Sequence, residues 1–285
     1  MALLRRGIHF GSYGHVDDGP AVFDRLVAAA QAAEAAGFDA ISVPDHVHQN
    51  QIAGGPASPM FDAYTVLGAL AMHTESALLL ALVSPVSLRS PGLLAKAVTT
   101  LDVLSRGRAA LGVGAGWDVA EHDAYGIAFP PTGERFDRLD EALQVSRALF
   151  TRQPATVTGA HYAVAGAYNS PRPVHGGIPI LVAGGGERRT LDLVARYGDA
   201  CNVLADLATV PRKFGVLRAH CERAGRDPAE ITKTVFAFDP GDLGKLAADA
   251  GALADAGADG MIIVGPQDPA RIAGIGEALA GAFPD

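Results

Sequence analysis

The sequence predicts an α/β protein, a (β/α)₈ TIM barrel with an insertion between the fourth and fifth strands. Two observations support this fold class. Helix-like segments that end near a glycine lead into short apolar strands at four places, and eight strand-then-helix units follow one another along the chain. Strands that alternate with helices form a parallel sheet. Eight units in series favour a closed barrel over an open doubly wound sheet, which is the structural alternative.

The first junction illustrates how the elements are assigned. Apolar residues from Phe23 to Ala33 recur at helical spacing, Gly37 can supply a left-handed cap, and residues 40–44 form a short apolar run typical of a buried strand. The same order of elements recurs along the rest of the chain. We expect the eight strands at residues 7–11, 40–44, 79–84, 109–113, 178–182, 200–204, 233–238 and 260–264, each followed by a helix.

Two connections are longer than the few residues that usually join a strand to a helix. The first covers residues 46–62 and is rich in glycine, proline and polar residues, and the second covers residues 117–177. The second contains a pattern that predicts a helix over about 133–151 and a hairpin through 156–164. Long loops in compact domains are commonly functional. We interpret the second connection as an insertion into the barrel and not as a second domain.

Length and composition indicate the class of protein. A chain of 285 residues that is 49% hydrophobic can bury one large core, so we expect a single domain over 1–285. The longest apolar run, residues 77–83, is too short to cross a bilayer, and the first residues lack a signal-peptide core. We expect a cytoplasmic protein with no membrane partner.

Charge and cysteine content exclude several further classes. The formal net charge is -8 and no stripe of basic residues with interleaved aromatics is present, so nucleic acid is not an expected partner. Cys201 and Cys221 are the only cysteines and form no CxxC motif. The sequence therefore indicates neither a disulfide scaffold nor a zinc site. A small-molecule substrate is the expected partner.

His46 is the strongest candidate for acid/base chemistry. It follows Asp45 at the carboxyl end of a predicted strand, where the active site of a (β/α)₈ barrel forms. An imidazole there can exchange a proton near neutral pH, and the adjacent carboxylate can bias its charge. The alternative is that His46 is a solvated or structural residue, as a lone loop histidine often is.

Two glycine-rich segments follow predicted strands. Residues 184–189, GGGERR, combine free backbone amides, a helix start and two arginines, Arg188 and Arg189, so they form a candidate phosphate site. The alternative is a tight strand-to-helix turn. Residues 112–116, GVGAG, match a dinucleotide fingerprint only superficially, because the third glycine comes one residue early. Their simpler meaning is close approach of the backbone to something flat.

Absent residue types also narrow the chemistry. The only lysines are Lys96, Lys213, Lys233 and Lys245, and none is predicted at a strand's carboxyl end, which disfavours a Schiff-base aldolase. No carboxylate and histidine set for a metal is evident, and we expect no metal. Such a site is better suited to a cofactor that brings its own reactivity.

Several segments resemble the luciferase-like monooxygenase superfamily. ALVSPVSLRSPGLLAK at 81–96 and TLDVLSRGR at 100–108 carry this resemblance. The segments that are similar to the actinobacterial F420-dependent branch are AALGVGAGW at 109–117, EHDAYG at 121–126, GERFDRLDEAL at 133–143 and ILVAGGGERRTL at 180–191. Their order and spacing cover most of the chain. The resemblance implies a barrel that transfers a hydride between coenzyme F420 and a small organic substrate, with FMN as the alternative cofactor.

The resemblance also implies roles for individual positions. It places Asp45 and His46 at the cofactor ring, with His46 as the catalytic acid/base group. It places the bulge of the third strand behind the ring, the end of the fourth strand at the ring or its side chain, and the start of the 184–189 segment at the phosphate. The implied cofactor-binding residues are Asp45, His46, Ser84, Pro85, Val86, Gly114, Ala115, Gly116, Gly184, Gly185, Gly186 and Glu187.

Two positions depart from the family pattern. The family often has a non-prolyl cis peptide in the third-strand bulge, and Pro85 stands where glycine is common, so we expect the cis bond at Ser84-Pro85 or Pro85-Val86. Some F420 enzymes use a carboxylate soon after the fourth strand. Here Trp117 and Asp118 occupy that region and Glu121 lies one turn later, which leaves the proton donor open.

Three functions remain as hypotheses at this point. The first is F420-dependent hydride transfer, the second is an FMN-dependent monooxygenase, and the third is a phosphate-binding isomerase or lyase that uses no redox cofactor. A non-catalytic cofactor carrier is a further possibility. The family resemblance also leads us to expect a homodimer, since relatives often associate through barrel helices.

Overall fold

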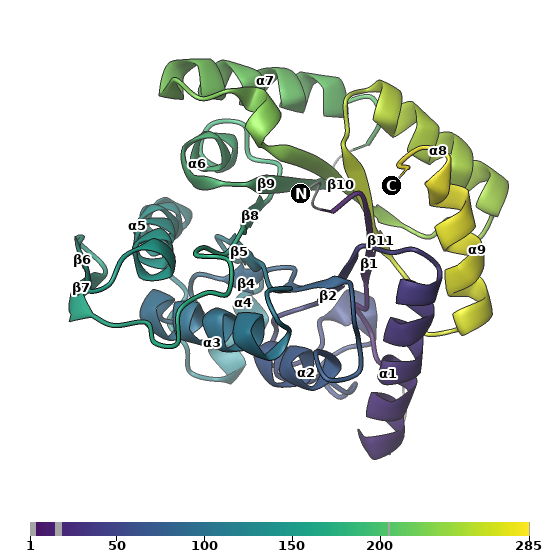
Figure 1. The fold of residues 1–285 in the computed structure, drawn as a ribbon, viewed down its shortest axis with the longest axis horizontal. Helices are drawn as coiled ribbons and strands as arrows, with labels where there is room; N and C mark the ends of the chain where they lie inside the picture. Colours follow the sequence, from purple (N-terminus) through teal and green to yellow (C-terminus); the bar gives the residue numbers. More distant parts are fainter. Residues whose placement is uncertain (1–3, 15–18, 205, 285) are drawn as a thin grey trace.

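The computed structural model describes residues 4–14, 19–204 and 206–284. Parallel strands form an inner ring and helices surround it (Figure 1). The strands of the ring are β1 (Arg6–His9), β2 (Ala40–Val43), β3 (Leu78–Ala81), β4 (Ser84–Pro85), β5 (Leu111–Gly114), β8 (Ile180–Ala183), β9 (Ala200–Leu204), β10 (Thr232–Phe238) and β11 (Gly260–Val264). The helices are α1 (Gly19–Ala35), α2 (Ala63–Leu70), α3 (Pro91–Leu104), α4 (Val119–Ala124), α5 (Thr132–Thr151), α6 (Thr190–Tyr197), α7 (Val210–Ala224), α8 (Leu243–Asp255) and α9 (Pro269–Ala280), with the 3₁₀ turns η1 (Gln51–Ala53) and η2 (Pro228–Glu230).

The strands close into a barrel. Their order is β3-β2-β1-β11-β10-β9-β8-β5-β4, and every pair in this sheet is parallel. Closure between β3 and β5 rests on Leu79, whose amide donates to Arg108 O at 2.7 Å and whose carbonyl accepts from Ala110 N at 3.1 Å. The predicted (β/α)₈ TIM barrel is therefore confirmed, and the open sheet is excluded.

The third strand is broken, and this break corrects the expected position of the cis peptide. The predicted strand over 79–84 is split into β3 and β4, and the non-prolyl cis bond joins Leu82 to Val83, whereas the two bonds on either side of Pro85 are trans. The backbone of β5 comes so close here that a Cβ on Gly112 would lie 2.0 Å from Ala81 O. The chain therefore leaves the sheet directly after Ala81 and rejoins β5 at Ser84.

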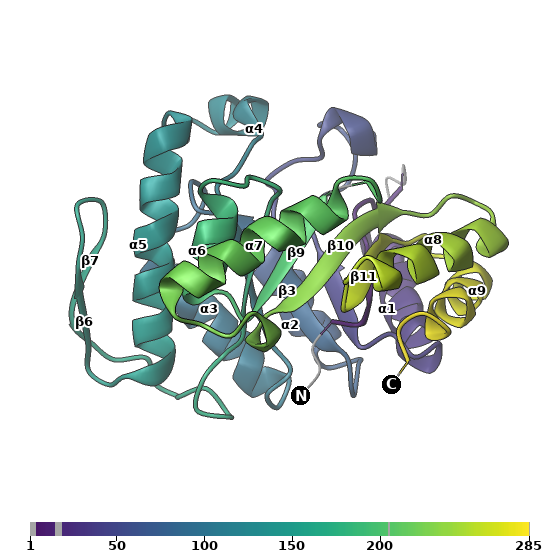
Figure 2. The ribbon, with the colours of Figure 1, turned by 90° about the horizontal axis from the view of Figure 1, so that it is seen from above.

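The insertion follows the barrel between β5 and β8. It contains α4, the predicted long helix as α5, and the predicted hairpin as β6 (Ala155–Thr158) and β7 (Ala163–Ala167). Figure 2 shows the hairpin along the outside of α5 and α4 projecting beyond the ring of helices. The sequence pattern did not predict α4, because six residues are too short to display a helical period. Asp118 starts this helix by accepting bonds from the amides of Ala120 and Glu121.

The helices pack their apolar faces on the outside of the barrel. In α1 the buried side chains recur at helical spacing, as predicted, and Gly37 adopts the left-handed conformation with φ of 78°. Alternate strand residues, such as Ile41 and Leu79, join this outer core, whereas Ala40, Leu78 and Ile262 belong to a separate cluster inside the barrel. Among the described residues, no helix has the length and apolar character needed to cross a membrane.

The upper part of the barrel interior is polar. His9 Nδ1 lies 3.0 Å from Ser42 Oγ, and Asn202 Nδ2 donates to Thr234 Oγ1 at 2.8 Å. All four side chains are buried. Burial lowers the pKa of His9 to about 3, and the nearby imidazole of His46 adds to the shift, so the His9 ring is neutral in the folded protein.

This low pKa predicts acid sensitivity. Between pH 6.5 and about 3 the unfolded chain takes up a proton at His9 that the folded chain does not, so folding stability falls as the pH falls. The slope from one such group reaches about 1.4 kcal/mol per pH unit, or about 2 kcal/mol between pH 6.5 and about pH 5. We expect His9→Gln to unfold with a shallower pH dependence than wild type in urea titrations. Parallel slopes would contradict this assignment.

Candidate functional site

A cavity of about 330 Å³ lies at the carboxyl ends of the barrel strands, within the size range of small-molecule sites. Six of the predicted site residues line it: His46, Pro85, Gly114, Ala115, Gly116 and Gly184. The other lining residues are Leu82, Val83, Trp117, Phe136, Ala183, Thr190, Asn202, Leu204 and Phe236. The walls are thus mostly apolar, with a few polar groups.

His46 faces this cavity and is held from behind by Glu121. The His46 Nδ1 atom lies 2.9 Å from Glu121 Oε1, and the amide of Val47 donates to Glu121 Oε2 at 3.1 Å. Glu121 is completely buried. A carboxylate in this position accepts a hydrogen bond from Nδ1–H, which leaves Nε2 as the ring nitrogen that can exchange a proton with a ligand. Among the described residues, none bonds to Nε2.

Of the residues that follow the fourth strand, Glu121 is the carboxylate that contacts His46. Trp117 lines the cavity with its ring edge-on to His46, at 5.6 Å between centroids. The Asp118 side chain caps α4, and Glu121 lies one turn later with its carboxylate against His46. The sequence placed Glu121 in the right segment. The contact itself was not predictable from spacing, because 75 residues separate it from His46.

His46, Asp118 and Glu121 also correct the expectation that the chain has no carboxylate and histidine set. One ligand atom from each lies within 4.8 Å of the others. Their atoms already have partners, however: the Glu121 oxygens accept from His46 and Val47, and Asp118 accepts from two amides of α4. A metal would have to displace these bonds. The set is therefore explained by the positioning of His46.

Asp45 and Ser84 form a buried network behind the cavity and do not line it. Asp45 is 2% exposed, and its carboxylate accepts from Ser84 Oγ at 2.6 Å and from two nitrogens of Arg89 at 2.8 Å. Arg89 also bonds to Asp62, and Tyr64 bonds to Ser84. The hydrogen bond with Asp45 raises the pKa of Arg89. The network fixes the end of β2 against β4, so these residues position the site.

Val86 has a similar supporting place. It is buried, its amide donates to Gly114 O at 2.9 Å, and its carbonyl accepts from Tyr162 Oη at 3.3 Å. Of the predicted 84–86 bulge, only Pro85 reaches the cavity, where Leu82 and Val83 accompany it. The cis bond between those two residues lies in the cavity wall.

Glycines form one wall of the cavity. A Cβ on Gly114 would lie 3.0 Å from Val83 Cγ2, and Gly116 combines a φ of 79° with a Cβ position only 2.9 Å from Ser87 Oγ. Side chains at these positions would clash or strain the backbone. The wall is therefore made of backbone that a ligand can approach closely, as expected for a flat group.

The 184–186 loop receives a cation that the sequence did not assign to it. Lys213 of α7 donates from Nζ to Gly185 O at 2.6 Å and lies 3.9 Å from Glu187 Oε1. Lys213 lies in a helix and not at a strand's carboxyl end, as the sequence predicts, but its side chain reaches the loop that follows β8. Arg189, by contrast, bonds to Asp137 and Gly133 of α5. Lys213, together with the start of α6, makes the loop suitable for an anion.

The lining residues that the sequence did not identify lie on the strands themselves. Asn202 and Leu204 alternate with outward-facing residues of β9, and Phe236 occupies the equivalent inward position on β10. Period-two alternation near a strand end is the signal that could have identified them.

Fold and site together define a (β/α)₈ barrel with a cavity at the carboxyl ends of its strands, a histidine backed by a buried carboxylate on one wall and the start of the 184–186 loop on another. Residues 7–238 match the sequence profile of the luciferase-like monooxygenase family. The chain therefore belongs to this family.

Individual relatives extend the comparison. An F420-dependent glucose-6-phosphate dehydrogenase of Beutenbergia cavernae is 36% identical over 175 residues, 61% of this chain and 50% of that protein. An F420-dependent hydroxymycolic acid dehydrogenase of Mycobacterium tuberculosis is 32% identical over 219 residues, 75% of this chain and 58% of that protein. The match thus spans half of the first relative and 58% of the second. The F420-dependent tetrahydromethanopterin reductase of Methanopyrus kandleri has the same fold, with a TM-score of 0.78, 18% identity and 99% of both chains covered.

Removal of Arg89, the cation that pairs with Asp45, should lower the free energy of unfolding strongly. Arg89→Ala leaves a buried carboxylate without its guanidinium partner, which we expect to destabilise the protein by about 3–5 kcal/mol. Arg138→Ala is the matched control, because its ion pair with Glu134 is a helix-surface pair worth at most about 1 kcal/mol. Urea unfolding of both variants measures the difference. Equal losses would show that Asp45 does not depend on Arg89.

Proposed function

We propose that the protein is an F420-dependent oxidoreductase that transfers a hydride between the deazaflavin and a small organic substrate. The observation that carries this proposal is the His46 and Glu121 pair, which presents an imidazole nitrogen to a glycine-walled cavity at the strand ends. Family membership supports a flavin-type cofactor, and the F420-dependent relatives at 32–36% identity support F420 over FMN.

The residues present fit such a cofactor. Leu82, Val83 and Pro85 offer an apolar wall, and Gly114 and Gly116 offer the backbone surface that a flat ring requires. The 184–186 loop with Lys213 and the start of α6 would hold the phosphate. When bound, F420 accepts or supplies the hydride. The predicted roles of Gly185, Gly186 and Glu187 remain proposals, since these residues do not line the cavity.

The chain's own groups would handle the proton that accompanies the hydride. Oxidation of an alcohol releases a proton from its hydroxyl, and Nε2 of His46 is the group that can accept it. Glu121 would act as a positioning residue, because it fixes the ring orientation and stabilises the imidazolium that forms. Trp117 and Phe136 would shield the reacting atoms from water.

Cofactor titration tests this proposal directly. We expect F420 to bind with saturable quenching of its fluorescence and FMN to bind more weakly. Lys213→Gln should weaken F420 binding by about ten- to a hundredfold, because it removes a charged hydrogen-bond donor. Arg212→Gln is the control, since Arg212 is exposed and pairs with Glu187. Tighter binding of FMN would favour a monooxygenase. Binding of neither would favour a phosphate-binding isomerase or lyase.

Substitution of Glu121 separates positioning from binding. We expect Glu121→Gln to reduce the rate of F420 reduction by an active alcohol about a hundredfold while leaving F420 affinity unchanged. Asp123→Asn, on the exposed side of the same helix, is the control. The ¹⁵N chemical shifts of the His46 ring should show the Nδ1–H tautomer in wild type and its loss in Glu121→Gln. An unchanged tautomer and rate would remove Glu121 from this role.

A further inference from the structure

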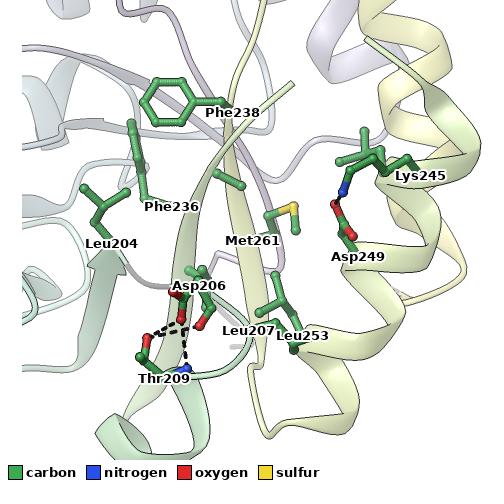
Figure 3. Close-up of a pocket in the computed structure, with 13 residues that line it drawn as sticks. Leu204, Asp206, Leu207, Thr209, Phe236, Phe238, Lys245, Asp249, Leu253 and Met261 are labelled. Carbon is green, nitrogen blue, oxygen red and sulfur yellow. Dashed lines mark hydrogen bonds and ion pairs between the residues drawn. The ribbon is translucent and has the colours of Figure 1, made fainter. Parts of the chain in front are cut away.

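Asn202 is the only carboxamide side chain among the described residues that line the cavity. It lies on β9 and is 4% exposed. Phe236 of β10 lines the same cavity, and Figure 3 shows its ring on the opposite side of β10 from Leu253 and Met261, which belong to the outer core. Asn202 therefore belongs, like Phe236, to the inner face of the barrel. A polar side chain buried there needs hydrogen-bond partners.

The orientation of the Asn202 amide is fixed by Thr234, its register partner on β10. The Thr234 hydroxyl donates its only proton to Cys201 O at 2.8 Å, so Oγ1 can only accept a bond from Asn202. The donor is Asn202 Nδ2, also at 2.8 Å. Oδ1 therefore points away from Thr234. Among the described residues, Oδ1 has no hydrogen-bond partner, and it is left for a ligand in the cavity.

The order of the strands places Asn202 across the barrel from His46. β1, β11 and β10 lie between β2 and β9 in one direction around the ring, and β3, β5 and β8 lie between them in the other. The apolar wall proposed for the cofactor ring belongs to the broken third strand, between β3 and β5. A ring on that wall leaves the space between His46 and Asn202 for the substrate.

The cavity favours an uncharged partner for Asn202. Among its described lining residues there is no lysine, arginine, aspartate or glutamate. A neutral donor satisfies Oδ1 without the cost of burying a charge. Nδ2 also has a second proton that bonds to none of the described residues. A hydroxyl group can donate to Oδ1 or accept from Nδ2, so it matches both atoms of the amide.

We propose that Asn202 is a specificity-determining residue that accepts a hydrogen bond from a second hydroxyl group of the substrate, while the reacting hydroxyl lies at His46. The substrate class is then an uncharged diol or polyol. Thr234 is a positioning residue, because it fixes the orientation of the amide. This inference rests on the proposed oxidoreductase function and specifies its substrate class.

Matched alcohols with and without a second hydroxyl test the proposal. We would titrate the F420-loaded protein with cyclohexanol and with the three positional isomers of cyclohexanediol, using ligand-observed NMR. At least one diol should bind about tenfold more tightly than cyclohexanol, because a ligand without the second hydroxyl leaves a buried acceptor unpaired. Equal affinities, or no measurable binding of any of these alcohols, would overturn the inference.

A substitution that removes the acceptor makes the test specific. Asn202→Leu keeps a similar volume and should abolish the preference for the diol, while F420 binds as in wild type. Asn169→Leu is the matched control and should keep the preference. Asn169 is 3% exposed and its Oδ1 also has no partner, but its Nδ2 bonds to Thr99 and Leu149, away from the cavity. Circular dichroism and thermal melts check that both variants fold.

A second pair of variants tests the orientation of the amide without changing Asn202. Thr234→Val has nearly the same shape but lacks the oxygen that accepts from Nδ2, so the amide is free to turn and the preference for the diol should fall. Thr234→Ser keeps this oxygen and should retain the preference. Equal preferences in these two variants would remove Thr234 from the positioning role.

The outcomes separate this inference from the proposed function. A diol preference that persists in Asn202→Leu would overturn the inference and leave the cofactor assignment intact. A loss of F420 affinity in Asn202→Leu as large as the loss of diol affinity would place Oδ1 at the cofactor, which also overturns it. Failure of the wild-type protein to bind F420 would overturn the cofactor assignment instead, and the same alcohol titrations on the free protein would still decide the role of Asn202.

Discussion

Glu121 lies fully buried beneath His46, and both of its oxygens accept hydrogen bonds from the loop that follows β2. A buried carboxylate is unfavourable unless it is bonded in this way, so the short helix α4 and the end of β2 must come together when the chain folds. This constraint orients the imidazole of His46 toward the cavity. It also fixes the position of the six-residue helix α4, which carries Glu121.

The rest of the frame depends on close backbone approach. Gly112 allows the carbonyl of Ala81 to come where a side chain would otherwise lie, and the chain then turns at Leu82 and Val83 into the cavity wall. Asp45 and Arg89 hold the next stretch of the chain in place. Two kinds of group can thus be distinguished. Side chains with strong hydrogen-bond partners inside the protein hold the strand ends in place, whereas glycine backbone and apolar side chains line the cavity.

The barrel and much of the insertion were predictable because local periodicity specifies them, as in α1, α5 and the β6–β7 hairpin. The site was predictable only in part. His46, Pro85, Gly114, Gly116 and Gly184 could be placed at the cavity because strand ends converge on one face of a barrel. Contacts between distant segments leave no local signal, so the bond from Glu121 across 75 residues and the bond from Lys213 to Gly185 across 28 were not identified. The cis bond was misplaced because residue type at Pro85 says nothing about how closely β5 approaches β3.

Charge and polarity divide the surroundings of the cavity into two regions. Lys213 lies next to the 184–186 loop and the start of α6, whereas Leu82, Val83 and Pro85 form an apolar wall. The proposed cofactor would place its phosphate at the first region and its ring against the second. The His46 and Glu121 pair belongs to neither region. Binding of the cofactor and transfer of the proton would therefore depend on different contacts.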